Sequence, residues 1–532
     1  MTIRRPLHVG LALVSWLIAA ASLGCDPASS PPAESDPSPT ADPGPEPEPA
    51  EYPRCNPIPD CDDTIHVDPE SAALFITDPE VLAKVPLKRV MEQLVATSQV
   101  SYGPEEALQR LFDTMNQSEY GKFTDTPHCD DAGVLADAAS RGDFLTCPRT
   151  EGKLAFSEGL LDDGGPDSFL PVAIVNRFDL TPINAGRCGQ YRIIYAKRSG
   201  LTDPKDRVFL IFEPALQNPA GCLEACRPIA KDWHALQGAS TAEIGAFVEA
   251  LFFEGVRGFA PVIHPSSFGP PREEEEGGGY GGGFEDEDEG GQIRVSMHMG
   301  DEPWNMRELR FTESPLTGER TFLPMPVRNN PPVSQVTPQA FSEGTTLMPA
   351  VLLDFSLPTL TGKDVSALQI FVPLSMNAVE SPIEGPKKID YHAAATQKGS
   401  TYIEEMIDDT LSRRGFDADC PPGDPLDARA LLNRATALSC AGCHSPSTLI
   451  GPERSLGCGL TWPDSIGQVH VTEKREISPA LKEVFLPHRA KVLETYLQAC
   501  DLDAMFGNFQ SGQPQNGFKK VQGGTLGGGS TH

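Results

Sequence analysis

The distribution of cysteines limits most strongly where and how this chain can fold. Thirteen cysteines are spread along 532 residues, and their spacing matches no zinc-binding pattern that we can assign. So many thiols would be a liability in a reducing cytosol, whereas disulfides form and persist in oxidising compartments. The sequence therefore predicts an exported protein that is stabilised by disulfides.

The N-terminal residues also indicate export. Two arginines near the start precede an apolar run over 9–21 that is short for a bilayer span, as in an export signal peptide. The alternative is a retained membrane anchor. The run ends in Ser22-Leu23-Gly24-Cys25, which resembles the lipobox of bacterial lipoproteins, although Ser22 stands where Leu is usual. The resemblance implies that Cys25 is lipidated and anchors the protein to a bacterial membrane on its extracytoplasmic side; the inner and outer membranes both stay open.

Composition divides the chain into regions. Residues 26–53 contain ten prolines and seven acidic residues but no Lys or Arg, a composition that cannot bury apolar surface and predicts a disordered tether over 26–54. A stretch rich in Gly and acidic residues predicts a solvated insert at 270–291, and 507–532 is predicted to be a flexible tail. Residues 1–25 form the predicted signal peptide and lipobox. The folded parts are then 55–415 and 416–506.

The formal charge is −31, from 74 acidic and 43 basic residues. Such a balance argues against nucleic acid and anionic lipid as direct partners, because both are negatively charged. Much of the surplus lies in the tether and in the insert, where 273–289 alone holds nine acidic residues. The folded parts are therefore only moderately acidic.

Residues 55–415 are predicted to form a large α+β region that contains disulfides. Ser240, with Glu243 three residues later, forms a capping-box pattern that predicts a helix over 240–254, and a second helix is expected over 398–413. We expect α+β because strands and helices do not alternate strictly. No Gly-x-Ser-x-Gly, His-Glu-x-x-His or Walker phosphate-loop pattern occurs, so no catalytic residue is assigned and the role of this region stays open. Apolar, β-branched runs predict strands at 170–175, 191–195, 208–212, 292–297 and 306–311.

Two clusters in this region have a metal-binding alternative. Cys222 and Cys226 could bind a metal with His234, but disulfides are favoured in an exported chain. The run Met297-His298-Met299 carries ligands that suit Cu(I). A strand would place the two Met side chains on one face and His298 on the other, so core packing of the methionines is favoured.

Near the C-terminus the sequence reads Cys440-Ala441-Gly442-Cys443-His444. Cys-x-x-Cys-His is the attachment pattern of a covalently bound haem, since each thiolate can form a thioether to a vinyl group and the adjoining His can bind the iron. These residues resemble the haem-binding motif of c-type cytochromes. The resemblance implies covalent haem c on Cys440 and Cys443, with His444 as the proximal iron ligand. The alternative is a simple disulfide with His444 uninvolved.

With Cys25 and the Cys440/Cys443 pair set aside, ten cysteines remain, which allows five disulfides.

The surroundings of the motif strengthen the resemblance. Asp424-Pro425 predicts a capped helix that leads into Cys440, and a closing helix with an aromatic residue is predicted over 492–500. Residues 416–506 therefore resemble the small all-α cytochrome c fold.

The second iron ligand cannot be the residue that is usual in c-type cytochromes. The usual ligand is a Met before the closing helix, but no Met lies between His444 and Met505. The available imidazoles are His470 and His488. We favour His470 as the distal ligand because it precedes the closing helix. The alternative is that His470 only forms hydrogen bonds.

The sequence leaves three functions open. The favoured hypothesis is an exported, lipid-anchored c-type cytochrome that transfers single electrons outside the cytoplasm to a redox partner that the sequence does not identify. The second is a peroxidase-type haem enzyme with an open sixth site, in which the central region supplies catalytic groups or a ligand such as His264 or His298. The third is a non-redox, disulfide-rich lipoprotein that binds a surface.

Overall fold

The computed structural model describes the central and C-terminal parts of the chain. All described residues fall within one compact unit, Ala50–His532. The predicted signal peptide, Cys25, the tether, most of the 270–291 insert and the predicted tail lie outside them. The described residues are 55, 62–113, 150–162, 164–182, 185–269, 290–301, 304–313, 318–370, 372–373, 376–382, 390–414, 420–444, 455–500 and 502.

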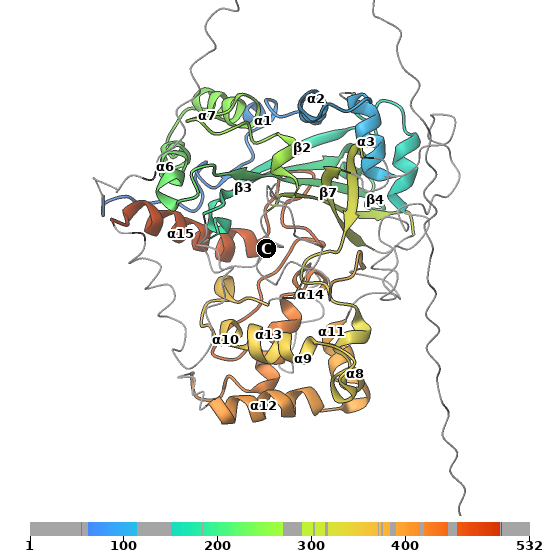
Figure 1. The fold of residues 1–532 in the computed structure, drawn as a ribbon, viewed down its shortest axis with the longest axis vertical. Coiled ribbons are helices and arrows are strands. Elements are labelled where there is room, and N and C mark those ends of the chain that lie inside the picture. The colour runs from blue at the N-terminus through green and yellow to red at the C-terminus, as the bar shows by residue number, and fades with distance from the viewer. Residues whose placement is uncertain are drawn as a thin grey trace, which may run out of the picture. The chain divides into compact units, whose positions relative to one another are not determined.

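One antiparallel sheet organises the fold (Figure 1). Its strand order is β1-β2-β3-β4-β6-β7-β8, with β5 paired to β3 and β9 paired to β7. All five predicted strands are confirmed, as β2, β3, β4, β6 and β7. Together with the helices, they confirm the α+β class. The strands are β1 Phe75–Ile76, β2 Phe169–Arg177, β3 Arg187–Lys197, β4 Asp206–Glu213, β5 Ala215–Gln217, β6 Gln292–Met299, β7 Asn305–Glu313, β8 Arg320–Met325 and β9 Ser381–Pro382.

One face of the sheet packs against helices, because alternate residues of each strand point to the same side. The ring of Tyr191 in β3 stacks on Trp233 of α6 with 5.4 Å between centroids. The hydroxyl of Tyr195 donates to the carbonyl of Val85 at 2.7 Å. These contacts belong to a large buried core beneath five helices, which are α1 Pro79–Leu82, α2 Leu87–Ser98, α3 Pro104–Phe112, α6 Arg227–Ala235 and α7 Thr241–Glu249.

The capping box that predicted the helix at 240–254 is formed. The Oγ of Ser240 accepts from the Glu243 amide, while the Glu243 carboxylate accepts from the Ser240 amide at 2.8 Å. The helix continues beyond α7 as a π-helical turn, η5 Ala250–Glu254. The prediction for 240–254 is therefore confirmed in both start and extent.

The remaining helices lie beyond the other face of the sheet (Figure 1). Helix α13 is buried in a second core together with α8 to α12, whereas the apolar residues of α15 belong to the core of the sheet. The structure does not confirm a separate all-α cytochrome-like domain, and whether 416–506 folds by itself stays a prediction. These helices are α8 Pro338–Glu343, α9 Met348–Ala350, α10 Leu357–Leu360, α11 Tyr391–Ala395, α12 Tyr402–Arg414, α13 Ala428–Ala437, α14 Cys440–His444 and α15 Leu486–Gln498.

Two predicted helix starts were wrong. Helix α12 begins at Tyr402 and not at Lys398, which has a left-handed φ of 59° that ends a helix. Asp427 caps α13 by accepting from the Ala430 amide at 2.8 Å. Asp424, the predicted cap, instead accepts from the hydroxyl of Ser455 at 2.7 Å.

The predicted disulfides are confirmed for three pairs, Cys55–Cys222, Cys188–Cys226 and Cys420–Cys458. Cys500 is disulfide-bonded as well. Because Cys222 and Cys226 belong to different disulfides, the alternative of a metal site with His234 was wrong. Cys61, Cys129 and Cys147 lie outside the described residues.

Candidate functional site

Helix α13 leads directly into the Cys-x-x-Cys-His motif, and a buried arginine holds its position. Arg434 is fully buried, and its guanidinium donates to the carbonyls of Leu456, Leu360 and Gly362 at 2.5 to 2.7 Å. Hydrogen bonds from a charged donor are the stronger kind. They join α13 to the C-terminal end of α10 and to the loop that contains Leu456, so the position of the motif depends on tertiary contacts.

The motif itself forms the single helical turn α14. A Cβ placed on Gly442 would lie 2.1 Å from the carbonyl oxygen of Thr436, so only glycine fits at this close approach to α13. Cys443 is buried. Cys440 lies in the same turn, although its side chain is outside the described part of the structure.

His444 is held in one tautomer. Its Nδ1 lies 2.9 Å from the carbonyl oxygen of Gln468. Since a carbonyl can only accept, Nδ1 carries the hydrogen and Nε2 is the basic nitrogen. Burial lowers the pKa of His444 to about 4, so the imidazole is neutral at neutral pH. A neutral imidazole with its second nitrogen bonded to a carbonyl is the form that binds metals.

His470 lies beside His444. The two ring centroids are 5.1 Å apart, and Nδ1 of His470 is 2.9 Å from the hydroxyl of Ser478. The Sγ of Cys443 lies 3.8 Å from Nε2 of His470. The ligand atoms of Cys443, His444 and His470 all lie within 4.8 Å of one another. The structure thus brings together three of the predicted site residues across 27 positions of sequence.

These three residues line a pocket between the C-terminal segment and the sheet. Its empty volume is about 990 Å³, which includes space open to solvent. Leu481 and Phe485 line it from the C-terminal segment, whereas Val175, Ile194 and Ile211 line it from the sheet. The central region therefore forms one wall of the pocket that holds the motif.

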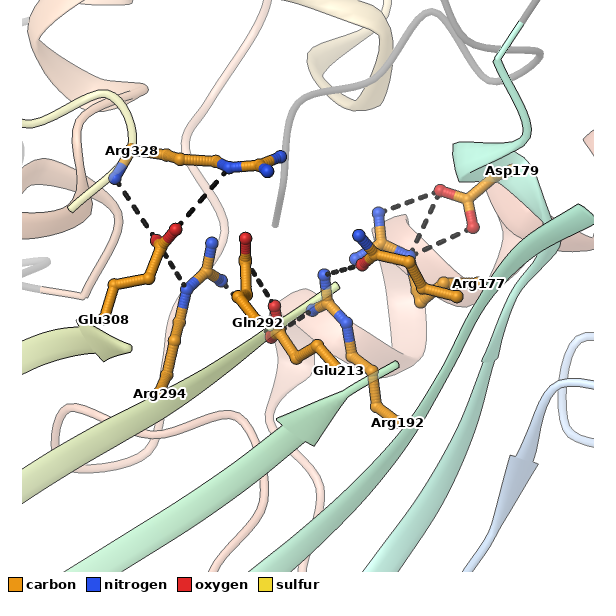
Figure 2. A network of polar contacts seen from close by, with 9 residues as sticks. Arg177, Asp179, Arg192, Glu213, Gln292, Arg294, Glu308 and Arg328 are labelled. Carbon is orange, nitrogen blue, oxygen red and sulfur yellow. Dashed lines mark hydrogen bonds and ion pairs between the residues drawn. The ribbon is translucent and has the colours of Figure 1, made fainter. Parts of the chain in front are cut away.

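Charged groups also line this wall, and sequence reasoning missed them. Arg192 of β3, Glu213 of β4 and Arg294 of β6 lie on the pocket face of the sheet, and Arg489 reaches the pocket from α15. Figure 2 shows the first three within a chain of polar contacts that crosses the strands. The signal that could have found them is a charged residue at alternate positions inside otherwise apolar strands.

The other histidines that were considered lie elsewhere. His488 pairs with Asp364 at 3.7 Å, and the hydrogen bond from His488 lowers the pKa of Asp364 to about 2. His298 stacks on Trp304, and His264 contacts the hydroxyl of Ser266 at 2.7 Å. None of the three histidines is among the described residues that line the pocket.

Met297 is buried in the core of the sheet, as expected from its position in a strand.

Comparison with known proteins identifies no relative: no family model, no curated protein and no solved structure matches this chain. Within the described residues, no helix is both long enough and apolar enough to cross a membrane.

Proposed function

We propose that the chain is an exported, lipid-anchored c-type cytochrome that binds one haem covalently and transfers single electrons outside the cytoplasm. The observation that carries the proposal is the shared position of Cys443, His444 and His470 on one pocket, which both apolar and charged side chains line. The Cys-x-x-Cys-His pattern supplies the mode of attachment. The lipid anchor rests on the sequence around Cys25.

The donor set fits a haem. Cys440 and Cys443 would hold it through thioether bonds, and His444 would bind the iron through Nε2 while its Nδ1 donates to the Gln468 carbonyl. His470, with Nδ1 beside the Ser478 hydroxyl, is the proposed distal ligand. When bound, the haem supplies an iron that takes up and releases one electron. Apolar side chains such as Leu481 and Phe485 would pack against it, and the part of the haem that they shield from water would tune its potential.

The test is maturation of the full chain in a host with haem-attachment machinery. We expect the intact mass to rise by one haem and the spectrum to be that of low-spin, six-coordinate iron. The Cys440→Ala/Cys443→Ala double variant should lose the covalent adduct. His66→Ala is the matched control, because the exposed side chain of His66 pairs with Glu494, and neither residue lines the pocket. A colourless protein without an adduct would refute the proposal and leave the non-redox lipoprotein.

Binding of carbon monoxide to the reduced protein distinguishes the electron-carrier hypothesis from the peroxidase hypothesis. With His470 on the iron, the reduced protein should not bind carbon monoxide, and the His470→Ala variant should bind it. Binding to the native protein, together with peroxide turnover that His444→Ala abolishes, would instead support the enzyme.

A second candidate is a Cys-His-His site for a single metal ion. The close grouping of one thiol and two imidazoles favours it, since these ligands suit zinc and copper. Metal analysis of the purified protein distinguishes the two. One equivalent of zinc or copper that Cys443→Ala removes, in protein without haem, would support this candidate.

Membrane attachment is tested by fractionation. The native chain should be found with the membranes, and the Cys25→Ala variant should be soluble after cleavage of the signal peptide.

A further inference from the structure

The second core, which α8 to α13 form, is not completely filled. A pocket with an empty volume of about 460 Å³, which includes space open to solvent, lies among these helices (the helical pocket). Protein interiors contain few voids larger than a water molecule. This space among buried side chains is therefore a candidate ligand site. Each of these helices except α10 contributes a lining side chain that is less than a tenth exposed, namely Phe341, Met348, Tyr391, Ile403 and Leu432.

The lining of the helical pocket offers few free polar groups. Three of the four polar side chains among its described residues donate hydrogen bonds within the protein. The hydroxyl of Tyr391 donates to the carbonyl of Pro331 at 2.8 Å. The hydroxyl of Thr436 donates to the Asn433 carbonyl at 3.0 Å, and that of Ser439 donates to the Thr436 carbonyl at 2.7 Å. Since a buried water needs roughly two to four polar partners, the lining favours an apolar occupant over water.

Exposed apolar side chains adjoin this lining in the chain. Leu347 is 64% exposed and directly precedes Met348, while Tyr402 is 37% exposed and directly precedes Ile403. They are the two exposed large apolar residues in the part of the chain that the structure describes. Single apolar residues on a surface are ordinary, but both of these neighbour lining residues of one pocket. An apolar molecule would therefore meet apolar side chains outside the pocket as well as within it.

The helical pocket adjoins the pocket that holds the motif, but its lining is different. Asn329 is the one described residue that lines both. Ser439 lines the helical pocket, and its Oγ accepts from the amide of Gly442 in the motif at 3.0 Å. Because the two pockets share a border, an experiment must show which of them a probe enters.

We infer that the helical pocket binds a small, neutral, apolar molecule of the aromatic-hydrocarbon class. The inference goes beyond the proposed function and does not depend on it, because none of the described lining residues is a proposed haem ligand. Such a molecule would give the buried side chains dispersion contacts that they lack around an empty space. A charged molecule would lose its hydration without gaining a charged partner from the described lining.

The test uses the full chain, with fluorobenzene as the probe and fluorine NMR as the measurement. We expect saturable binding and displacement of the probe by benzene. Para-fluorobenzoate should bind at least about tenfold more weakly, because its carboxylate would be buried without a partner. Absence of saturable fluorobenzene binding, or tighter binding of para-fluorobenzoate, would overturn the inference.

A filling variant tests the location of the site. Ala395 of α11 is buried and lines the helical pocket, so Ala395→Leu should occupy the space and abolish fluorobenzene binding. Ala83→Leu is the matched control, because Ala83 is exposed at the end of α1. Binding that persists in a folded Ala395→Leu protein would place the probe in another site and refute the assignment.

An enlarging variant covers the case in which Ala395→Leu does not fold, as judged by circular dichroism. Leu352 is also buried in the lining, and Leu352→Ala enlarges the pocket. This variant should bind the larger probe fluoronaphthalene at least about tenfold more tightly than the native chain does, because the larger ring then fits without overpacking. Equal affinity of the two proteins for fluoronaphthalene would refute the assignment.

Discussion

Gly442 of the Cys-x-x-Cys-His motif lies where the surrounding atoms leave no room for a larger side chain. In an ordinary helix, replacing glycine by alanine is favourable by up to about 1 kcal/mol. Here the added methyl would meet the Thr436 carbonyl oxygen at 2.1 Å and the Ser439 Oγ at 2.9 Å. The close contact should make the substitution of Gly442 by alanine destabilising, because overpacking costs about 1–3 kcal/mol.

We therefore predict that Gly442→Ala lowers the free energy of unfolding in urea and reduces the yield of haem adduct. Gly165→Ala is the control, since a Cβ there meets nothing within 4 Å. A Gly442→Ala protein with native stability and full haem loading would show that α14 moves freely away from α13.

Asp179 illustrates a buried ion pair with a defined pH dependence. Burial raises the pKa of Asp179, but Arg177, assisted by Arg489 and His488, outweighs this and holds the pKa at about 2. The unfolded value is about 3.9. A carboxyl group whose pKa is lower in the folded state stabilises the protein fully above the unfolded value, and loses that contribution as the pH falls towards about 2.

We predict that Asp179→Asn is destabilised at about pH 7, by about 3–5 kcal/mol, because the buried guanidinium of Arg177 loses the carboxylate that it contacts at 2.9 Å. The difference from the native protein should shrink between about pH 4 and 2. Urea unfolding over this acidic range measures it. Asp409→Asn, which breaks an exposed pair with Arg413, should follow the native curve. If the free energy of unfolding of Asp179→Asn differs from that of the native protein by the same amount at every pH, the lowered pKa of Asp179 is contradicted.

At the scale of elements, one ion pair joins the sheet to the segment that carries His470. Arg207 of β4 contacts Glu473 through two hydrogen bonds, at 2.6 and 3.0 Å, and Glu473 is almost fully buried. Short bridges between 466 and 469 and between 471 and 477 are the other regular pairings of this segment. The ion pair should therefore restrain His470.

We predict that Glu473→Gln costs about 3 kcal/mol, near the lower end for a broken buried pair, because Arg207 is partly exposed. Amide hydrogen exchange should rise over 466–477 before it rises in the sheet. Asp301→Asn removes a fully exposed pair with Lys205 nearby and is the control. Unchanged protection over 466–477 would mean that the pair does not hold the segment.

For the whole molecule, the two cores do not divide at the predicted boundary near residue 415. Helix α13 shares its core with α8 to α12, and the hydroxyl of Tyr496 in α15 donates to the carbonyl of Leu223 beside α6. Arg227 of α6 donates in return to the carbonyl of Ala499 at 3.0 Å. A fragment of 416–506 would expose both surfaces.

We therefore predict that the 416–506 fragment shows no cooperative unfolding transition, whereas the full chain does. Urea denaturation followed by circular dichroism measures this. A fragment that unfolds cooperatively and attaches haem would instead establish an independent cytochrome domain, and the pocket wall from the sheet would not be required.

The sequence by itself determined the local structure. Alternating apolar runs indicated five strands, and Ser240 with Glu243 indicated a helix start, because backbone preference and capping depend on near neighbours. The Cys-x-x-Cys-His motif was visible for the same reason. The cap of α13 was assigned to Asp424 because Pro425 follows it, as at the first position of many helices. In the folded protein Asp424 instead contacts Ser455, and Asp427 is the cap.

Only the tertiary structure decided what surrounds the motif. His470 could be proposed from its place before a helix, but its distance from His444 depends on contacts between distant segments. The partners of Cys222 and Cys226 depend on the path of the whole chain. The buried arginines could not be placed either, because strand register sets which residues of β3, β4 and β6 lie side by side. Long-range pairing, which no local pattern encodes, turns scattered charges into one wall of a pocket.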